Sequence, residues 1–218
     1  RSIAAHLAEQ GILVEQPETK VIATGYGRIA VDYADKVMTE LTCHGKGGYF
    51  LVQKNCTIID VGGQDTKVIS MADGMMTDFL MNDKCSAGTG KVLEIMANRL
   101  GVDITELFEL AQTGVPISIS SMCTVFAESE IISQIGAGEP RQNIAAGVVD
   151  SVATKVANLA KRHGIKGTCV LTGGLSKEPF FAQILTDKLN TPVLAPELGA
   201  YAGALGAALL AREKFPTA

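Results

Sequence analysis

The sequence contains no tryptophan and no long hydrophobic run. An α-helix needs about 20 consecutive apolar residues to cross a bilayer, and the longest candidate, residues 201–211, is shorter and rich in small residues. The sequence therefore predicts no membrane span. Hydrophobic residues make up 47% of the 218 residues and charged residues 19%, which excludes a disordered chain and allows one large or two small domains.

The sequence also has no excess of positive charge. Lys and Arg number 19 against 23 Asp and Glu, which gives a formal net charge of -4. Proteins that bind nucleic acid usually carry a basic stripe that neutralises phosphates, and the sequence shows no such stripe. We therefore expect no nucleic-acid partner.

Cysteine is scarce, and the number of cysteines, five, is odd. An odd number in a sequence that shows no signal peptide argues against the disulfide framework of a secreted protein. We therefore expect a cytoplasmic protein whose free thiols are available for metal or redox chemistry.

The order of the predicted elements is typical of an α/β fold. Short β-branched runs alternate with stretches whose apolar residues recur at helical spacing, as in residues 148–159. Strands are predicted at residues 21–24, 56–61, 66–70, 75–81, 168–171 and 192–194. Helices are predicted at residues 2–7, 35–51, 86–100, 104–112, 124–135, 144–162, 179–189 and 199–212.

The first of three glycine-rich turns, residues 60–65, has the sequence DVGGQD and lies between two predicted strands. Gly62 and Gly63 would let backbone N–H groups approach phosphate oxygens, because no side chain intervenes. Asp60 could hold Mg²⁺ through water, and Gln64 could orient a water for attack on a γ-phosphate. Gly-Gly is also a common turn dipeptide, and the motif by itself favours an ordinary hairpin.

The second turn contains Thr172, Gly173 and Gly174 and lies between a predicted strand and a predicted helix. It could carry an adenosine against bare backbone, although strand-to-helix loops of this kind are common. It is not a Rossmann fingerprint, and none of the three turns is a Walker A loop, which would need Lys-Ser or Lys-Thr after its last glycine.

The third turn contains Gly88, Thr89 and Gly90 and opens a predicted helix. Backbone amides at a helix N-terminus can face a phosphate or another anion. The alternative is a helix N-terminus that simply needs small residues, and both interpretations remain open.

Cys85 and Cys123 differ from the other cysteines because each directly precedes a predicted helix. The partial positive charge of a helix N-terminus stabilises a thiolate and lowers its pKa. Two thiolates cannot fill the four iron positions of a cubane cluster, but a symmetric dimer would supply the second pair. A free cysteine is also often just a small buried hydrophobic residue, and that interpretation stays open.

The remaining cysteines and the histidines have simpler interpretations. Cys56 and Cys169 lie in apolar strands and are expected in the core. A helix carries both Cys43 and His44, which we expect to pack because no further ligands lie near them in the sequence. The other two histidines, His6 and His163, are expected to face solvent.

Taken in order, five segments carry a resemblance to a known family. The segments are residues 23–28 (ATGYGR), 60–65 (DVGGQD), 82–90 (NDKCSAGTG), 123–130 (CTVFAESE) and 171–174 (LTGG). The sequence resembles the activator, or component A, of the (R)-2-hydroxyacyl-CoA dehydratases, which belongs with the BadF/BadG/BcrA/BcrD-type ATPases. The resemblance covers essentially the whole chain, and the cysteine motifs are its most specific part.

This resemblance implies the fold of the acetate and sugar kinase, Hsp70 and actin superfamily, in which ATP or ADP and Mg²⁺ lie in a cleft between two RNase H-like halves. Residues 60–64 correspond to the phosphate-2 loop and residues 172–174 to the adenosine loop. The resemblance also implies a homodimer that shares one [4Fe-4S] cluster, bound by Cys85 and Cys123. A ferredoxin or flavodoxin would reduce the cluster, and ATP would drive one low-potential electron to the dehydratase.

One departure concerns the start of the chain. Members of the family begin with a phosphate-1 loop of the form Asp-x-Gly-Ser-Thr, which does not occur here and would belong upstream of Arg1. The first N-terminal strands are therefore expected outside this sequence. On this basis, residues 1–84 are expected to be the remainder of the N-terminal half with the phosphate-2 loop. Residues 85–218 would then hold the cluster helices and the C-terminal half.

Three other functions remain open at this point. An ATPase subunit of benzoyl-CoA reductase would share these motifs but assemble as a heteromer. A kinase-like phosphotransferase of the same superfamily would lack the cluster, and the motifs around Cys85 and Cys123 count against it. A nucleotide-binding module without catalysis is a further possibility.

Overall fold

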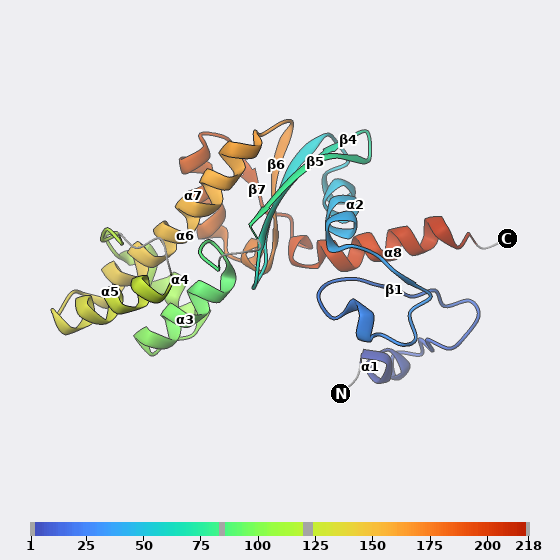
Figure 1. Cartoon of the computed structure of the whole chain (residues 1–218), viewed down its shortest axis with the longest axis horizontal. Coiled ribbons are helices and arrows are strands. Elements are labelled where there is room, and N and C mark those ends of the chain that lie inside the picture. The colour runs from blue at the N-terminus through green and yellow to red at the C-terminus, as the bar shows by residue number, and fades with distance from the viewer. Residues whose placement is uncertain (1–2, 83–85, 120–123, 217–218) are drawn as a thin grey trace.

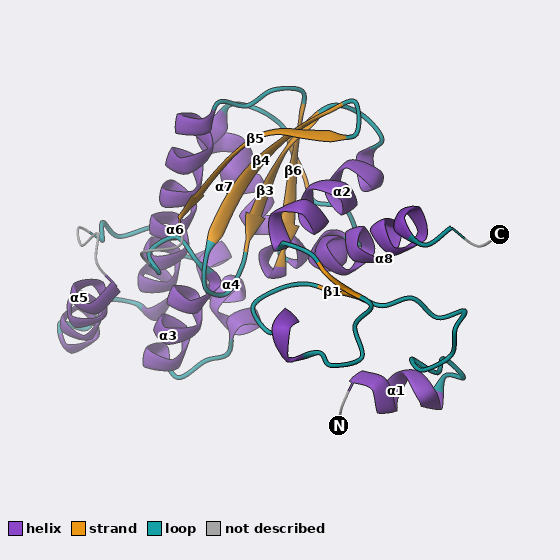
Figure 2. Ribbon diagram, turned by 45° about the vertical axis from the view of Figure 1, so that its right-hand side comes forward, coloured by secondary structure: helices purple, strands orange, loops and turns teal. Residues whose placement is uncertain are grey.

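A five-stranded sheet forms the centre of the protein (Figures 1 and 2). The structure is a computed structural model that describes residues 3–82, 86–119 and 124–216. The strand order is β5-β4-β3-β6-β7, with β3 antiparallel to β4 and parallel to β6. These strands are β3 (Cys56–Val61), β4 (Thr66–Ala72), β5 (Met75–Asn82), β6 (Thr168–Gly173) and β7 (Val193–Leu194).

The central strand β3 is buried on both faces, which explains its largely apolar sequence. Because successive side chains of a strand point to opposite faces, Ile58 and Ile59 belong to different hydrophobic clusters. Helices therefore cover the sheet on both sides.

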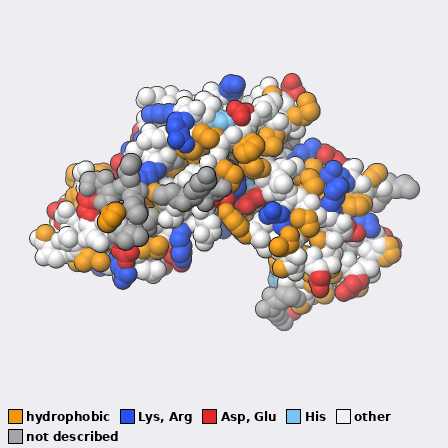
Figure 3. Space-filling view, in the orientation of Figure 1, with side chains coloured by type: hydrophobic (Ala, Val, Ile, Leu, Met, Phe, Trp, Pro, Cys, Tyr) orange, Lys and Arg blue, Asp and Glu red, His pale blue; other side chains and the backbone are white. Residues whose placement is uncertain are grey.

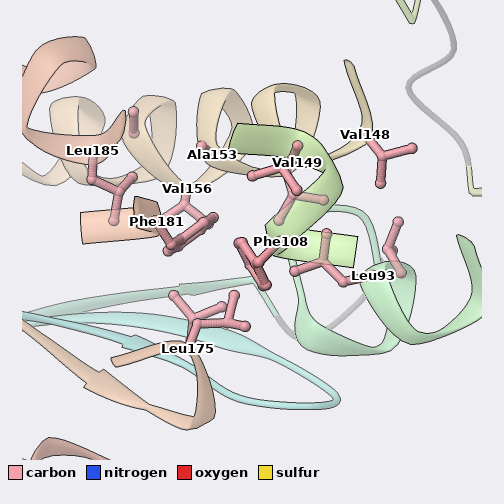
Figure 4. Packing of buried hydrophobic residues seen from close by; sticks show 14 of the residues in the cluster. Leu93, Phe108, Val148, Val149, Ala153, Val156, Leu175, Phe181 and Leu185 are labelled. Atoms are coloured by element: carbon pink, nitrogen blue, oxygen red, sulfur yellow. The ribbon is translucent and has the colours of Figure 1, made fainter. Parts of the chain in front are cut away.

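The larger core lies on the Ile59 side of the sheet, under five helices. Its centre holds Phe108 and Phe181, whose rings meet edge to face with centroids 6.2 Å apart (Figure 4). The long helix α6 contributes an apolar stripe that includes Val149 and Val156. The five helices are α3 (Gly90–Leu100), α4 (Ile104–Thr113), α5 (Thr124–Gly136), α6 (Arg141–His163) and α7 (Pro179–Leu189).

On the other side of the sheet, α2 (Glu40–Val52) packs against α8 (Ala202–Lys214). The two helices approach closely because glycines line their contact. A Cβ at Gly47 would overlap the carbonyl oxygen of Ala202, and one at Gly206 would overlap that of Cys43. Thr39 caps α2 by accepting a hydrogen bond from the amide of Thr42.

The N-terminal segment lies beside α8, apart from the central sheet (Figure 1). It contains α1 (Ile3–Glu9), the short parallel pair β1 (Ile22–Ala23) and β2 (Lys36–Val37), and the 3₁₀ turn η1 (Arg28–Ala30). Two further 3₁₀ turns, η2 (Gly174–Lys177) and η3 (Gly199–Tyr201), follow β6 and precede α8.

The structure confirms the predicted α/β alternation. It corrects the predicted starts of two helices and the expected exposure of one histidine. Helix α3 begins at Gly90 rather than at residue 86, because Gly88 has φ +88° and Thr89 is extended. The helix expected from residue 35 begins at Glu40, after the bridge at β2. His163, expected at the surface, has a side chain that is 2% exposed and bonds to Ser70.

The expected division of the chain at residue 84 falls within one sheet. Strands β3, β4 and β5 precede that position, and β6 and β7 follow it. All five strands are nevertheless hydrogen-bonded to their neighbours in one sheet. The phosphate-2 and adenosine segments therefore follow two neighbouring strands of the same sheet.

Two further features concern helix length and surface charge. Among residues 3–82, 86–119 and 124–216, no helix is both long enough and apolar enough to span a membrane. On the face drawn in Figure 3, acidic and basic side chains are interspersed.

Candidate functional site

The candidate site lies where the parallel strands β3 and β6 end. The strands are in register, with Asp60 opposite Thr172 and Val61 opposite Gly173. Thr172 Oγ1 donates a hydrogen bond to Asp60 Oδ1 at 3.1 Å, and both residues are buried. In open α/β sheets, ligands bind beyond the carboxyl ends of the strands, which is the edge where these two residues meet.

The two glycines after Thr172 have different structural roles. Gly173 has φ +80°, and a Cβ there would lie 2.5 Å from the carbonyl oxygen of Val61 and 2.8 Å from Asp60 Oδ1. Only glycine fits this position, because both the backbone conformation and the close approach exclude a side chain. At Gly174, an added Cβ would meet no atom within 4 Å, so this glycine borders open space.

A pocket of about 260 Å³ brings residues from all three predicted glycine turns together. Gly62 and Gly63 come from the first turn, Gly174 from the second and Gly90 from the third. Of the other predicted site residues, Asp60, Thr172, Gly173 and Thr89 are buried and do not line this pocket, Gly88 lines a separate pocket, and Gln64 is exposed next to Gly63 in the chain. The remaining lining residues are Val61, Lys91, Glu94, Ile104, Leu175 and Glu178.

The N-terminus of α3 is hydrogen-bonded to the first glycine turn. The amide of Gly90 donates to the carbonyl of Gly62 at 2.9 Å, and that of Lys91 donates to Gly63 at 3.1 Å. The amide of Thr89 donates to Ser86 at 3.0 Å. The amides of Gly90 and Lys91 therefore have acceptors within the chain and fix α3 to the first turn.

Next to Asp60, the structure reveals a buried charge cluster that the sequence did not indicate. The side chain of Lys67 is 2% exposed, and its Nζ lies 2.5 Å from Asp65 Oδ1, 3.2 Å from Glu40 Oε1 and 3.4 Å from Asp60 Oδ2. Tyr26, from the N-terminal segment, donates from its hydroxyl to Asp65 Oδ2 at 3.0 Å. The cluster therefore joins β3, β4, α2 and the N-terminal segment.

The pKa of Lys67 reflects two opposing effects. Burial by itself lowers this pKa, but Asp60, the hydrogen bond to Asp65 and the charge of Glu40 together raise it above its usual value. The three carboxylates therefore favour the charged form of Lys67. The hydrogen bond to Asp65 likewise raises the pKa of the Tyr26 hydroxyl.

His44 also belongs to this cluster, which corrects the expectation that it only packs. Its Nδ1 lies 3.2 Å from Asp60 Oδ1, and its Nε2 lies 3.7 Å from Glu40 Oε1. The Nδ1 contact lacks hydrogen-bond geometry, so it is an ion-pair contact when the imidazole is protonated. Ligand atoms of Glu40, His44 and Asp60 lie within 4.8 Å of one another.

The donor set fits Mg²⁺ bound through water better than a directly ligated metal. Mg²⁺ prefers oxygen ligands and keeps several of its waters, so Asp60 and Glu40 are suitable partners and His44 is not. The ammonium of Lys67 contacts Asp60 Oδ2 and Glu40 Oε1, and Asp60 Oδ1 accepts from Thr172, so these carboxylates would reach Mg²⁺ through its water shell.

The cysteines divide into two groups. Cys85 and Cys123 lie outside the described residues, and the helices that follow them in sequence, α3 and α5, begin at Gly90 and Thr124. Cys56 and Cys169 are buried free thiols in the core, as expected, and burial raises the pKa of each to about 11. Cys43 is buried between α2 and α8.

Comparison with known proteins agrees with this geometry. The model of the BadF/BadG/BcrA/BcrD ATPase family matches residues 1–211. The (R)-2-hydroxyglutaryl-CoA dehydratase activating ATPase of Acidaminococcus fermentans is 45% identical over 216 residues, which are 98% of this chain and 83% of that protein. A more distant relative, one of the subunits of the benzoyl-CoA reductase of Thauera aromatica, is 30% identical over 78% of this chain and 63% of its own length.

Among solved structures, the activator of the 2-hydroxyisocaproyl-CoA dehydratase from Clostridium difficile with bound ADPNP superposes with a TM-score of 0.89. It is 40% identical, and the match covers 95% of this chain and 78% of that chain. Two other solved structures, each less than 25% identical to this chain, have TM-scores of 0.50 and show only that the fold is shared. The fold is that of the acetate and sugar kinase, Hsp70 and actin superfamily, as the sequence predicted, and the chain belongs to the BadF/BadG/BcrA/BcrD ATPase family.

Proposed function

We propose that this protein is an ATP-dependent reductive activator of a 2-hydroxyacyl-CoA dehydratase, acting in the cytoplasm. The observation that carries the proposal is the pocket at the ends of β3 and β6, where three glycine turns meet and the Asp60–Thr172 pair joins the first two. It occurs in a chain 45% identical to a relative named as an activating ATPase.

The residues of the pocket suit the parts of a nucleotide. Gly62 and Gly63 present backbone to the phosphates, and Gly174 leaves room for the adenosine. Asp60 is held by Thr172 and Lys67 so that it can bind Mg²⁺ through water. The exposed side chain of Gln64 stands beside the first turn, where it can orient the attacking water. When bound, Mg²⁺ would offset the charge that develops on the phosphate oxygens.

The reductive half of the proposal rests on Cys85 and Cys123. Thiolates are the preferred ligands of iron–sulfur clusters, and two per chain suffice when a homodimer shares one [4Fe-4S] cluster on its two-fold axis. A ferredoxin or flavodoxin would supply the electron, and the dehydratase would receive it.

The described structure offers a route by which nucleotide binding can reach the cluster segment. The carbonyls of Gly62 and Gly63 hold the first turn of α3 through two hydrogen bonds, and α3 is the helix that follows Cys85 in the chain. A shift of the glycine turn around ATP therefore moves the start of α3 with it.

The first experiment measures iron, acid-labile sulfide and the EPR spectrum of the dithionite-reduced full-length protein, purified without oxygen. We expect about four irons per dimer, lost when Cys85→Ser and Cys123→Ser are combined. Cys43→Ala is the matched control and should keep its iron, since Cys43 is buried between α2 and α8. Protein without iron in every sample would remove the electron-transfer role and leave an ATPase or kinase of this fold.

The second experiment measures electron transfer to the dehydratase with ATP, with ADP and without nucleotide. Coupling between the sites requires transfer that depends on ATP. Equal rates in all three conditions would contradict the proposed activator function.

An ATPase subunit of benzoyl-CoA reductase is the second candidate, favoured by the relative from Thauera aromatica. Its lower identity, 30% against 45%, makes it the weaker proposal. A heteromeric complex isolated with this chain would support it, whereas an isolated homodimer that activates a dehydratase would exclude it. A third candidate is a cluster-free phosphotransferase of the same fold. Its purified protein would contain no iron and would transfer phosphate from ATP to a small substrate.

A further inference from the structure

Lys67 is fully buried, although its ammonium makes it one of the most costly groups to remove from water. We propose that Lys67 is a positioning residue for ATP hydrolysis, with its ammonium serving as an internal cation that holds Asp60 in place at the nucleotide site. This inference rests on the proposed function, because it assigns a role in the reaction proposed above.

The charges around Lys67 converge from separate parts of the chain. Asp60 is the last residue but one of β3, Asp65 precedes β4 and Glu40 begins α2, and each places an oxygen within 3.4 Å of the ammonium. Without a cation, three carboxylates at this distance would repel one another, and Asp60 would lose one of its two fixed partners. Lys67 therefore determines where the Asp60 carboxylate points.

The two carboxylate oxygens of Asp60 have different partners. Oδ2 faces Lys67 at 3.4 Å, whereas Oδ1 accepts from Thr172 at 3.1 Å and lies 3.2 Å from His44 Nδ1. Because each oxygen has its own partner, the carboxylate cannot rotate without breaking a contact. A carboxylate held this rigidly is preorganised for water-mediated contact with the cation of the nucleotide.

A second pocket, of about 180 Å³, reaches Lys67 from outside. Tyr26, Arg28, Glu40 and Asp65 contribute to its lining together with Lys67 itself. Replacing Lys67 by alanine would therefore leave a space bordered by carboxylates and open to small solutes. The same site would then accept a small soluble ammonium ion in place of the missing one.

The test is chemical rescue in the full-length protein. Lys67→Ala should lower kcat for ATP hydrolysis by roughly 10–100-fold while the Kd for Mg·ATP changes less than about threefold, as expected for loss of a supporting partner. Methylammonium or ethylammonium should raise the kcat of this variant at least about fivefold and leave the kcat of the wild type unchanged. Tetramethylammonium, which is too bulky and has no N–H donor, should restore nothing.

Two further variants make the result decisive. Lys67→Met fills the space without a charge, so it should lose kcat as Lys67→Ala does but resist rescue by amines. Lys188→Ala removes a lysine of α7 that pairs with Asp150 and does not line the nucleotide pocket, and the amines should not alter its rate. Folding of each variant is checked by circular dichroism and by thermal unfolding.

The possible outcomes separate this inference from the proposed function. Wild-type protein without ATPase activity would remove the proposed function. An active wild type with an equally active Lys67→Ala variant, or a folded inactive variant that no amine rescues, would overturn the role of Lys67 alone.

Discussion

Thr172 and Asp60 join the ends of the two central parallel strands, with Thr172 Oγ1 donating to Asp60 Oδ1 at 3.1 Å. The two residues are 112 positions apart in the chain, and neither is more than 1% exposed. The bond therefore links the first glycine turn to the second at the point where both leave the sheet.

Replacing Thr172 by valine keeps the shape and removes the hydroxyl. Asp60 Oδ1 would lose its donor in a buried site, and we expect the free energy of unfolding to fall by about 1–3 kcal/mol. For a protein of this size each kcal/mol lowers Tm by about 2–4 °C. Thr172→Ser keeps the hydroxyl and is the control. A Thr172→Val protein as stable as wild type would show that the bond contributes nothing.

Gly173 and Gly174 form a matched pair for separating stability from binding. Gly173→Ala places a Cβ against the Val61 carbonyl in a positive-φ conformation, so we expect destabilisation of about 1–3 kcal/mol. Gly174→Ala meets no neighbour within 4 Å, so stability should change by less than about 0.5 kcal/mol while ATP affinity falls, because the methyl group enters the pocket. Thermal unfolding and calorimetric titration with ATP measure the two effects, and the reverse pattern would contradict the assignment.

The sequence predicted the sheet and the glycine turns because their signals are local. The apolar run of β3 and the Gly62–Gly63 turn can each be recognised within a few residues. The start of α3 was predicted too early, since the positive φ of Gly88 delays the helix and depends on the packing of that loop against Lys155.

The charge cluster was missed for a different reason. Lys67 lies in a strand, where an isolated lysine is expected to face solvent. Two of its partners, Asp65 and Asp60, are near it in the sequence, but the third, Glu40, is 27 positions away on α2. His163 was missed likewise, since its partner Ser70 is 93 positions away on β4. Burial of such groups follows from how helices dock on the sheet, which periodicity in one segment cannot reveal.

The hydrogen bond from Gly90 to Gly62 offers a test of coupling between the nucleotide turn and α3. Gly90→Pro removes the donor, and because the Gly90 amide faces the Gly62 carbonyl at 2.9 Å, the proline ring also displaces that carbonyl. We expect ATP hydrolysis to persist while the number of electrons transferred per ATP falls by about fivefold, the equivalent of about 1 kcal/mol for one hydrogen bond. Gly90→Ala keeps the N–H and is the control. An unchanged ratio in Gly90→Pro would show that these bonds do not carry the coupling.

The buried thiols predict a loss of stability in alkaline solution. Burial raises the pKa of Cys56 and Cys169 from the usual 9.0 to about 11, so between these values the unfolded chain releases protons that the native protein keeps. The stabilising contribution is complete below pH 9 and is lost as the pH rises toward 11, by at most about 1.4 kcal/mol per pH unit for each thiol.

Denaturant unfolding at pH 8, 9 and 10 measures this slope, with the Cys56→Ala and Cys169→Ala variants as controls that should each flatten it. In the native protein at pH 8, iodoacetamide should spare both thiols, because neither is more than 1% exposed and both remain protonated. Rapid alkylation of Cys56 or Cys169 under native conditions, or a slope that the two variants do not change, would show that these strands open to solvent and would contradict their place in the core.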